Sequence, residues 1–402
     1  MPLPTIQSIA WGIILSYVFF RPFIAESTFS KLDITLNGLL LLAWAGYSLK
    51  RQIKIRLIDK TILIFFLSLL LSTINSNNIV VNLAQIYKYL SLIAVFYIIR
   101  LSNQEEQKQI FYALVISASL VALYSLHFLF NISGFTLEYL SEHNIRYPFA
   151  KEFLASKRAF APFFSPNLLA GYLIAIIMIC LNTIVKRKEE KDWLFFLSTF
   201  CLLMSSLALF FTKSVGGWFI FIITFSLFIL LGKLLNKKSL MIAFSLIVLL
   251  GAIAVNRTLT EVHFKNPLFS LNQRISYWKE TIKIIADHPI IGVGVGNFSL
   301  KEARAAHNSY LQIWAEMGIL GIVSWLVIVF VFIKQGVKNL YSRSGYCCLG
   351  ILTAGLSFLC YNLIDFSFFI SQVAFLFWLL LGLTVKYADT ADCLRRAPSD
   401  KN

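Results

Sequence analysis

Hydrophobic residues along the chain gather into long blocks, and charged residues fall mostly between them. Each block covers about 16–25 residues, the length that a helix needs to cross a hydrocarbon layer of roughly 30 Å. The pattern therefore predicts about twelve transmembrane helices in one polytopic domain, residues 1–402. The predicted helices cover residues 5–20, 34–49, 61–75, 82–99, 110–130, 166–185, 193–210, 214–232, 239–256, 309–333, 346–363 and 367–385.

The composition agrees with an all-α integral membrane protein. Hydrophobic residues make up 58% of the chain, whereas soluble domains contain roughly 45–50%. No part of the chain reads as a separate soluble domain. The six cysteines have no spacing typical of a zinc site or of a disulfide framework.

The net charge of +16 is explained by membrane topology and not by nucleic-acid binding. Lys and Arg concentrate in alternate short connections, and such loops face the cytoplasm. The basic connections cover about residues 50–60, 100–108, 186–191, 233–238 and 334–343. The intervening short loops carry only Arg21, Lys31 and Lys213. We therefore expect both termini of this membrane protein to lie in the cytoplasm.

Two long connections fall on the opposite, periplasmic side in this topology: residues 131–165 and residues 257–308. Long connections in a compact membrane bundle are usually functional or disordered. The second contains Leu271, Ile275 and Trp278 at spacings of four and three, followed by further apolar positions. This spacing predicts an amphipathic helix that lies on the bilayer surface or caps the bundle.

Basic residues in the long connections exceed what topology requires, and they include Arg158 and Arg274. Arg and Lys bind phosphates by charge and, for Arg, by paired hydrogen bonds. A solvated basic loop that touches anionic headgroups is the alternative. Lys213 precedes an apolar block and either binds an anion or extends to the outer interface.

His307 stands at the start of the predicted helix 309–333. A neutral imidazole there can take a proton from a sugar hydroxyl near neutral pH, although an interfacial histidine often serves only as a hydrogen-bonding residue. Glu316, further along that helix, either orients a cation or fills a buried polar role.

The run Gly292-x-Gly294-x-Gly296 favours a turn whose backbone approaches a ligand or a helix. A nucleotide site is not indicated, because no strand-turn-helix unit surrounds the glycines. The outer connections also lack a carboxylate cluster suited to a divalent cation. We therefore expect neither a metal nor a cofactor, and cationic side chains would neutralise charge in their place.

Several short motifs together resemble the O-antigen ligase and O-antigen polymerase superfamily. The motifs are Phe160-Ala161-Pro162-Phe163-Phe164-Ser165-Pro166-Asn167, Arg274-x3-Trp278, His288-Pro289-x2-Gly292-x-Gly294, His307-Asn308-Ser309-Tyr310 and Glu316-Met317-Gly318-x2-Gly321. They cover recognisable pieces of about residues 157–330. The resemblance implies a fold similar to that of GT-C-type membrane glycosyltransferases.

The resemblance also implies an activity: transfer of a glycan from undecaprenyl diphosphate to a sugar hydroxyl of the lipid A core, with inversion and without metal or nucleotide. It makes His307 the general base and Arg274 a diphosphate-binding arginine. It adds further substrate-binding candidates, which are Arg158, Asn167, Lys213, Asn308, Tyr310 and Glu316. The implied partners are the lipid-linked glycan donor, the lipid A core acceptor and membrane lipids.

One position departs from the family pattern. Where the family often has Ser-Arg-Gly, this chain has Ser214-Val215-Gly216. Val215 cannot bind phosphate. Lys213 can supply the missing charge only if the helix begins irregularly or the long side chain reaches round, because two helical positions differ by about 200°.

Two alternatives to a ligase stay open. An O-antigen polymerase would use a second lipid-linked glycan as acceptor. A transporter of lipid-linked oligosaccharide would place its charges along a path through the bundle. Most predicted spans contain no charge, and the polar residues concentrate at the outer face, which favours an enzyme.

Overall fold

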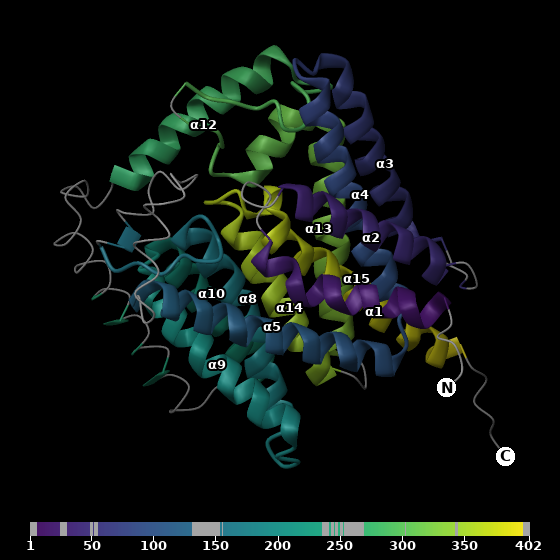
Figure 1. Cartoon of the computed structure of the whole chain (residues 1–402), viewed down its shortest axis with the longest axis vertical. Coiled ribbons are helices and arrows are strands. Elements are labelled where there is room, and N and C mark those ends of the chain that lie inside the picture. The colour runs from purple at the N-terminus through teal and green to yellow at the C-terminus, as the bar shows by residue number, and fades with distance from the viewer. Residues whose placement is uncertain are drawn as a thin grey trace.

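A computed structural model describes residues 6–24, 30–48, 55–130, 156–234, 269–301, 303–341 and 345–396, together with residues 51, 153–154 and a few positions between 241 and 252 (Figure 1). Three predictions therefore lie wholly or mainly outside the described residues. They are the helix 239–256, residues 131–152 of the first long connection and residues 257–268 of the second.

The described residues form helices and turns. The α-helices are α1 (Ile6–Phe20), α2 (Ser30–Ser48), α3 (Leu57–Leu71), α4 (Ile79–Leu101), α5 (Gln104–Phe130), α8 (Pro166–Lys186), α9 (Trp193–Thr212), α10 (Val215–Leu231), α12 (Phe269–Asp287), α13 (Ser309–Leu340), α14 (Gly345–Tyr361) and α15 (Ser371–Arg396). Short 3₁₀ helices are η1 (Arg21–Phe23), η2 (Ser72–Asn75) and η4 (Ser367–Phe369). A helix therefore lies at each predicted span that the structure describes, with ends shifted by a few residues.

Seven helices in the described part of the chain are long and apolar enough to cross a membrane. They include α3 extended by η2, α4, α5, α8, α9, α13 and the apolar part of α15. The helices α10 and α14 are apolar but shorter. The chain is thus a multi-pass membrane protein, and the count of about twelve spans stays a prediction.

The helices α8 and α15 form the centre of the bundle. In each, 83% of the most apolar window is buried, against 33% in α9. The uncovered side chains of α9 include Phe196 and Leu203, which are 57% and 58% exposed. Lipid tails are about as apolar as leucine, so an apolar helix face of this kind suits contact with lipid.

The helix α12 lies where the sequence predicts an amphipathic helix in the second long connection. It lies at one end of the molecule, outside the packed bundle (Figure 1). Its residue Ile285 is 6% exposed and packs with Phe298 and Ala306, whereas Leu271 is 44% exposed. One end of α12 is therefore held against the chain that leads into α13.

The loop that contains Gly292, Gly294 and Gly296 packs against α13 where that helix is interrupted. Gly318 has φ 66° and ψ −165° inside this helix. The N–H groups of Val293 and Gly294 donate to the carbonyl oxygens of Ala315 and Glu316 at 2.9 and 3.1 Å. A Cβ at Gly318 would lie 2.0 Å from the carbonyl oxygen of Ile290. The predicted turn therefore approaches a helix, as expected for glycines at these positions.

The same loop also docks on the connection between α3 and α4. Asn75 Nδ2 donates to the carbonyl oxygen of Gly292 at 3.0 Å, and the N–H of Asn78 donates to Asn297 Oδ1 at 2.8 Å. Irregular backbone at membrane depth is tolerated where protein satisfies its polar groups. These contacts hold the glycine loop against the connection between α3 and α4. The predicted topology places both of these connections on the outer side of the membrane.

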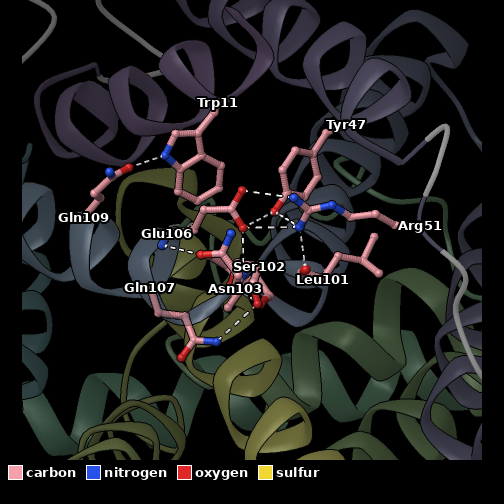
Figure 2. Close-up of polar contacts among 10 residues, drawn as sticks. Trp11, Tyr47, Arg51, Leu101, Ser102, Asn103, Glu106, Gln107 and Gln109 are labelled. Atoms are coloured by element: carbon pink, nitrogen blue, oxygen red, sulfur yellow. Dashed lines mark hydrogen bonds and ion pairs between the residues drawn. The ribbon is translucent and has the colours of Figure 1, made fainter. Parts of the chain in front are cut away.

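Basic residues at the opposite end hold neighbouring helices together. Figure 2 shows Arg51 beside Glu106, with 3.0 Å between Nη2 and Oε1. The Tyr47 hydroxyl donates to Glu106 Oε2 at 2.7 Å. Nearby, Arg100 and Asp59 form a buried ion pair of 2.6 Å. Residues that the topology argument assigns to the cytoplasmic side therefore also connect α2, α3, α4 and α5.

Candidate active site

His307 lies beside the carboxylate of Asp365, with 3.6 Å between Nδ1 and Oδ1. The Asp365 side chain is 2% exposed and that of His307 is 30% exposed. Nδ1 is buried and has no hydrogen-bond partner among the described residues, so the exposed area of the ring belongs to its other atoms. Hydrogen bonds in catalytic sites often tighten only when substrate binds, and a small movement would close this one.

The start of α13 is fixed to the turn that carries Asp365. The N–H of Ser309 donates to the carbonyl oxygens of Asn362 and Asp365 at 2.9 and 3.1 Å. The Ser309 hydroxyl donates to Asn362 Oδ1 at 2.6 Å. His307, two residues earlier, has φ 50°, a left-handed value that is uncommon outside glycine. These bonds hold the imidazole and the carboxylate side by side.

Aromatic rings from two other segments enclose His307. The Tyr277 ring of α12 stacks on the imidazole with 5.9 Å between centroids. The Phe366 ring meets it edge-on at 5.0 Å. Phe366 in turn lies 6.1 Å from Phe164, in the segment before α8. The rings connect the amphipathic helix and the Pro-Asn segment to the same histidine.

Arg274 precedes Tyr277 by about one helical turn on α12, so it lies near His307. Its guanidinium forms no hydrogen bond or ion pair with another described residue. The charges of Arg274, Arg158 and Asp365 all act on the Tyr361 hydroxyl, so the three residues belong to the same region at the end of α14.

Arg158 and Lys213 meet at the junction of α9 and α10. Arg158 is 5% exposed, and its Nε donates to the carbonyl oxygen of Thr212 at 3.0 Å. Lys213 Nζ donates to the carbonyl oxygen of Ser156 at 2.8 Å. Lys213 has φ 48° and α10 begins only at Val215. The irregular helix start required for Lys213 to take the place of the missing arginine is thus present.

Asn167 and Ser214 join this junction to α14. The Ser214 hydroxyl donates to Asn167 Oδ1 at 2.9 Å, and the Tyr361 hydroxyl donates to the carbonyl oxygen of Asn167 at 2.9 Å. Ser214 also caps α10 by accepting the N–H of Gly217 at 3.2 Å. Ser214 therefore takes part in the hydrogen bonds that join α10, Asn167 and α14, although its neighbour Val215 departs from the family pattern.

Three other predicted residues are tied into the protein itself. Asn308 caps α13 and accepts the N–H groups of Tyr310 and Leu311 at 3.0 and 3.1 Å. The Tyr310 hydroxyl donates to the carbonyl oxygen of Leu359 at 3.2 Å. Glu316 is 1% exposed, and it accepts the N–H of Gly296 and the Gln312 amide at 2.9 Å each.

The Glu316 network reaches the backbone next to the histidine. Gln312, which donates to Glu316, accepts the N–H of Ala306 at 3.1 Å. Glu316 thereby braces both the glycine loop and the segment that precedes His307. This arrangement gives Glu316 a positioning role, and no contact with a ligand is needed to explain its burial.

Two residues of the site, Asp365 and Tyr361, were missing from the sequence prediction. Asp365 is the single carboxylate between residues 346 and 385, and an ionisable residue between two apolar spans is itself a functional signal. Tyr361 carries no comparable signal, because a tyrosine near a helix end is ordinary in membrane proteins.

In the part of the chain that the structure describes, no three His, Cys, Asp or Glu side chains come together as metal ligands. The described cations at this end include Arg158, Lys213 and Arg274, all of which can bind phosphate. Metal independence stays a prediction.

The packed apolar helices define a multi-pass integral membrane protein, and the candidate site residues lie toward one end of it. Residues 200–326 match the family model described as O-antigen ligase. The match covers about a third of the chain and supports the resemblance to the O-antigen ligase and polymerase superfamily. No curated protein matches the chain. The matched segment contains Lys213, Arg274 and His307, while Arg158, Asn167 and Asp365 lie outside it.

Proposed function

We propose that this protein transfers an O-antigen glycan from undecaprenyl diphosphate to a sugar hydroxyl of the lipid A core, on the periplasmic face of the bacterial inner membrane. The family match supports ligase-type glycosyl transfer in general. The donor, the acceptor and the roles of individual residues belong to the proposal.

In the proposed reaction the acceptor hydroxyl oxygen attacks the anomeric carbon from the side opposite the diphosphate. The bond between the anomeric carbon and the diphosphate oxygen breaks, and undecaprenyl diphosphate leaves with the electron pair. His307 Nε2 accepts the hydroxyl proton. The product is a glycoside of inverted configuration, and no redox partner or nucleotide takes part.

Asp365 has a defined part in this scheme. When Nδ1 of the neutral imidazole carries the proton, Nε2 is the acceptor. Asp365 lies 3.6 Å from Nδ1, so its carboxylate would select that tautomer and stabilise the imidazolium that forms. General-base catalysis of this kind contributes roughly 10²–10⁴-fold.

The cations would stabilise the leaving group. Negative charge grows on the diphosphate as the anomeric bond breaks, and preorganised cations at such a position are usually a large part of catalysis. Arg274 has no competing hydrogen bond or ion pair among the described residues, which suits it to the phosphates. Arg158 and Lys213 are fixed to backbone carbonyls and would hold charge at the edge of the site.

The observation that carries the proposal is the His307–Asp365 pair beside α12, the helix that bears Arg274. The test is reconstitution of the purified protein with lipid-linked glycan and lipid A core, without nucleotide or added metal. We expect His307→Ala to reduce conjugate formation by at least about 10²-fold. His288→Ala is the matched control, since His288 is an exposed histidine of the same connection.

Full transfer by the His307→Ala protein would contradict the base assignment. A deletion strain separates ligase from polymerase. Polymer that accumulates on the lipid carrier without surface attachment indicates a ligase, whereas attached single repeats indicate a polymerase.

A further inference from the structure

A cavity with both polar and apolar walls lies at the end of the bundle opposite His307. It is a cavity of about 590 Å³ between α5, α8, α14 and α15, a volume within the usual range for small-molecule sites. Asn182 lines it and lies about 22 Å along α8 from Asn167. The cavity is therefore separate from the candidate active site.

The walls of this cavity are apolar where they face the middle of the bundle. Phe111 and Leu114 come from α5, Ile179 from α8, and Leu380 and Leu383 from α15. These residues belong to helices that are apolar enough to cross a membrane. A hydrocarbon chain would find a lining here as apolar as the bilayer itself.

The rim of the cavity is cationic. It contains Lys108, Lys186 and Arg187 against one carboxylate, Glu105. Lys108 is exposed and forms no ion pair with another described residue. Arg187 is held by Glu190 and Asp192, so its charge is largely offset. Lys108 and Lys186 are the two exposed lysines of the rim.

Asn182 adds an independent sign of a ligand. The residue is 9% exposed and lines the cavity, yet its amide forms no hydrogen bond with another described residue. Buried polar side chains normally have a partner. A phosphate or ester oxygen between the lysines and the apolar walls would accept its N–H.

We propose that this cavity binds an anionic glycerophospholipid, with its phosphate at Lys108 and Lys186 and one acyl chain along the apolar walls. Basic pockets between transmembrane helices on the cytoplasmic side are typical sites for anionic headgroups. Neither a soluble anion nor a neutral lipid would use both halves of the cavity. In the predicted topology the lipid belongs to the cytoplasmic leaflet, and its binding does not depend on the proposed glycosyl transfer.

The test titrates the full-length protein in neutral detergent with phosphatidylglycerol and with phosphatidylcholine, and bound lipid is measured by native mass spectrometry. We expect selective binding of phosphatidylglycerol. Lys108→Ala and Lys186→Ala should each weaken it about fivefold, and the double variant about 30-fold. Both side chains are exposed, so the variants should fold. Lys188→Ala, an exposed lysine of the same connection outside the cavity, should bind like the parent protein.

Asn182→Leu is a second variant that keeps the charge and removes the amide. We expect it to lower phosphatidylglycerol affinity about tenfold, the loss typical of one hydrogen bond to a charged group. Equal binding of phosphatidylcholine, or equal effects of Lys188→Ala and Lys108→Ala, would overturn the proposal. Tighter binding of glycerol phosphate would indicate a soluble anion, and tighter binding of a polyprenyl phosphate would indicate a carrier lipid. Each of those results would also overturn it.

Discussion

At the scale of single residues, the site depends on a carboxylate that is almost completely buried next to an imidazole. Asp365 is 1% exposed, and its Oδ2 accepts the Ser367 hydroxyl at 3.4 Å. A buried carboxylate is unfavourable unless it is paired and hydrogen-bonded. An imidazolium formed at His307 during the proposed reaction would give this carboxylate a charged partner.

Asp365→Asn tests this pairing because it preserves shape and removes the charge. We expect kcat for conjugate formation to fall about 10²-fold while KM for the lipid-linked donor and the melting temperature stay nearly unchanged. Steady-state kinetics in the reconstituted system measure kcat and KM separately. Asp287→Asn, at an exposed position at the end of α12, should leave both constants unaltered. A fall confined to KM would assign Asp365 to donor binding instead.

Substitutions at Arg274 can separate the effect of its positive charge from that of its paired hydrogen-bond donors. Arg274→Ala should raise KM for the lipid-linked donor at least about tenfold, since a charge-assisted hydrogen bond is lost. Arg274→Lys should recover part of that loss, because lysine keeps the charge but not the paired donors. Lys279→Ala, an exposed residue further along α12, is the control. Equal KM values for Arg274→Ala, Arg274→Lys and Lys279→Ala would contradict a role of Arg274 in donor binding.

At the scale of elements, the break in α13 couples the glycine loop to the start of the same helix. The loop donates to carbonyl oxygens that the broken turn leaves open. Glu316 holds Gly296 on one side and, through Gln312, the backbone of Ala306 on the other. The position of His307 therefore depends on a helix distortion at Gly318, eleven residues further along the chain.

Gly318→Ala should disturb this coupling. A methyl group would lie 2.0 Å from the carbonyl oxygen of Ile290, and the positive φ is itself unfavourable for alanine. We expect the melting temperature to fall by about 5 °C or more and transfer to decline with it. Gly12→Ala is the matched control, since nothing lies within 4 Å of its added Cβ. A Gly318→Ala protein as stable as the Gly12→Ala protein would show that the break is not required.

Sequence patterns could predict the helices because hydrophobic length is a direct consequence of bilayer thickness. Arg274, His307 and Lys213 are grouped as candidate site residues by the family resemblance and not by these patterns. The patterns could not assign Glu316, Asn308 and Tyr310 to internal bonds. Whether a polar side chain meets a ligand or a neighbouring helix depends on packing, which periodicity does not contain. Asp365 was missed for the same reason, because its partner lies 58 residues earlier in the chain.

At the scale of the whole molecule, the protein has two dissimilar ends. One combines the candidate active site with the glycine loop. The other contains the basic connections, the Arg51–Glu106 pair and the cavity with the lysine rim. A reaction at one face needs its acceptor and donor on that face, so the orientation of the bundle decides whether the proposed chemistry is possible at all.

Cysteine labelling in intact cells tests this orientation. Lys301 is exposed and close in sequence to His307, and Lys188 is exposed at the other end. We expect a membrane-impermeant maleimide that passes the outer membrane to label Lys301→Cys in intact cells, and Lys188→Cys only after the inner membrane is permeabilised. The parent chain, which has six cysteines of its own, gives the background labelling that is subtracted. The reverse pattern would place His307 in the cytoplasm, where a lipid A acceptor on the periplasmic face could not reach it, and the proposed transfer would fail even if every residue at the site were assigned correctly.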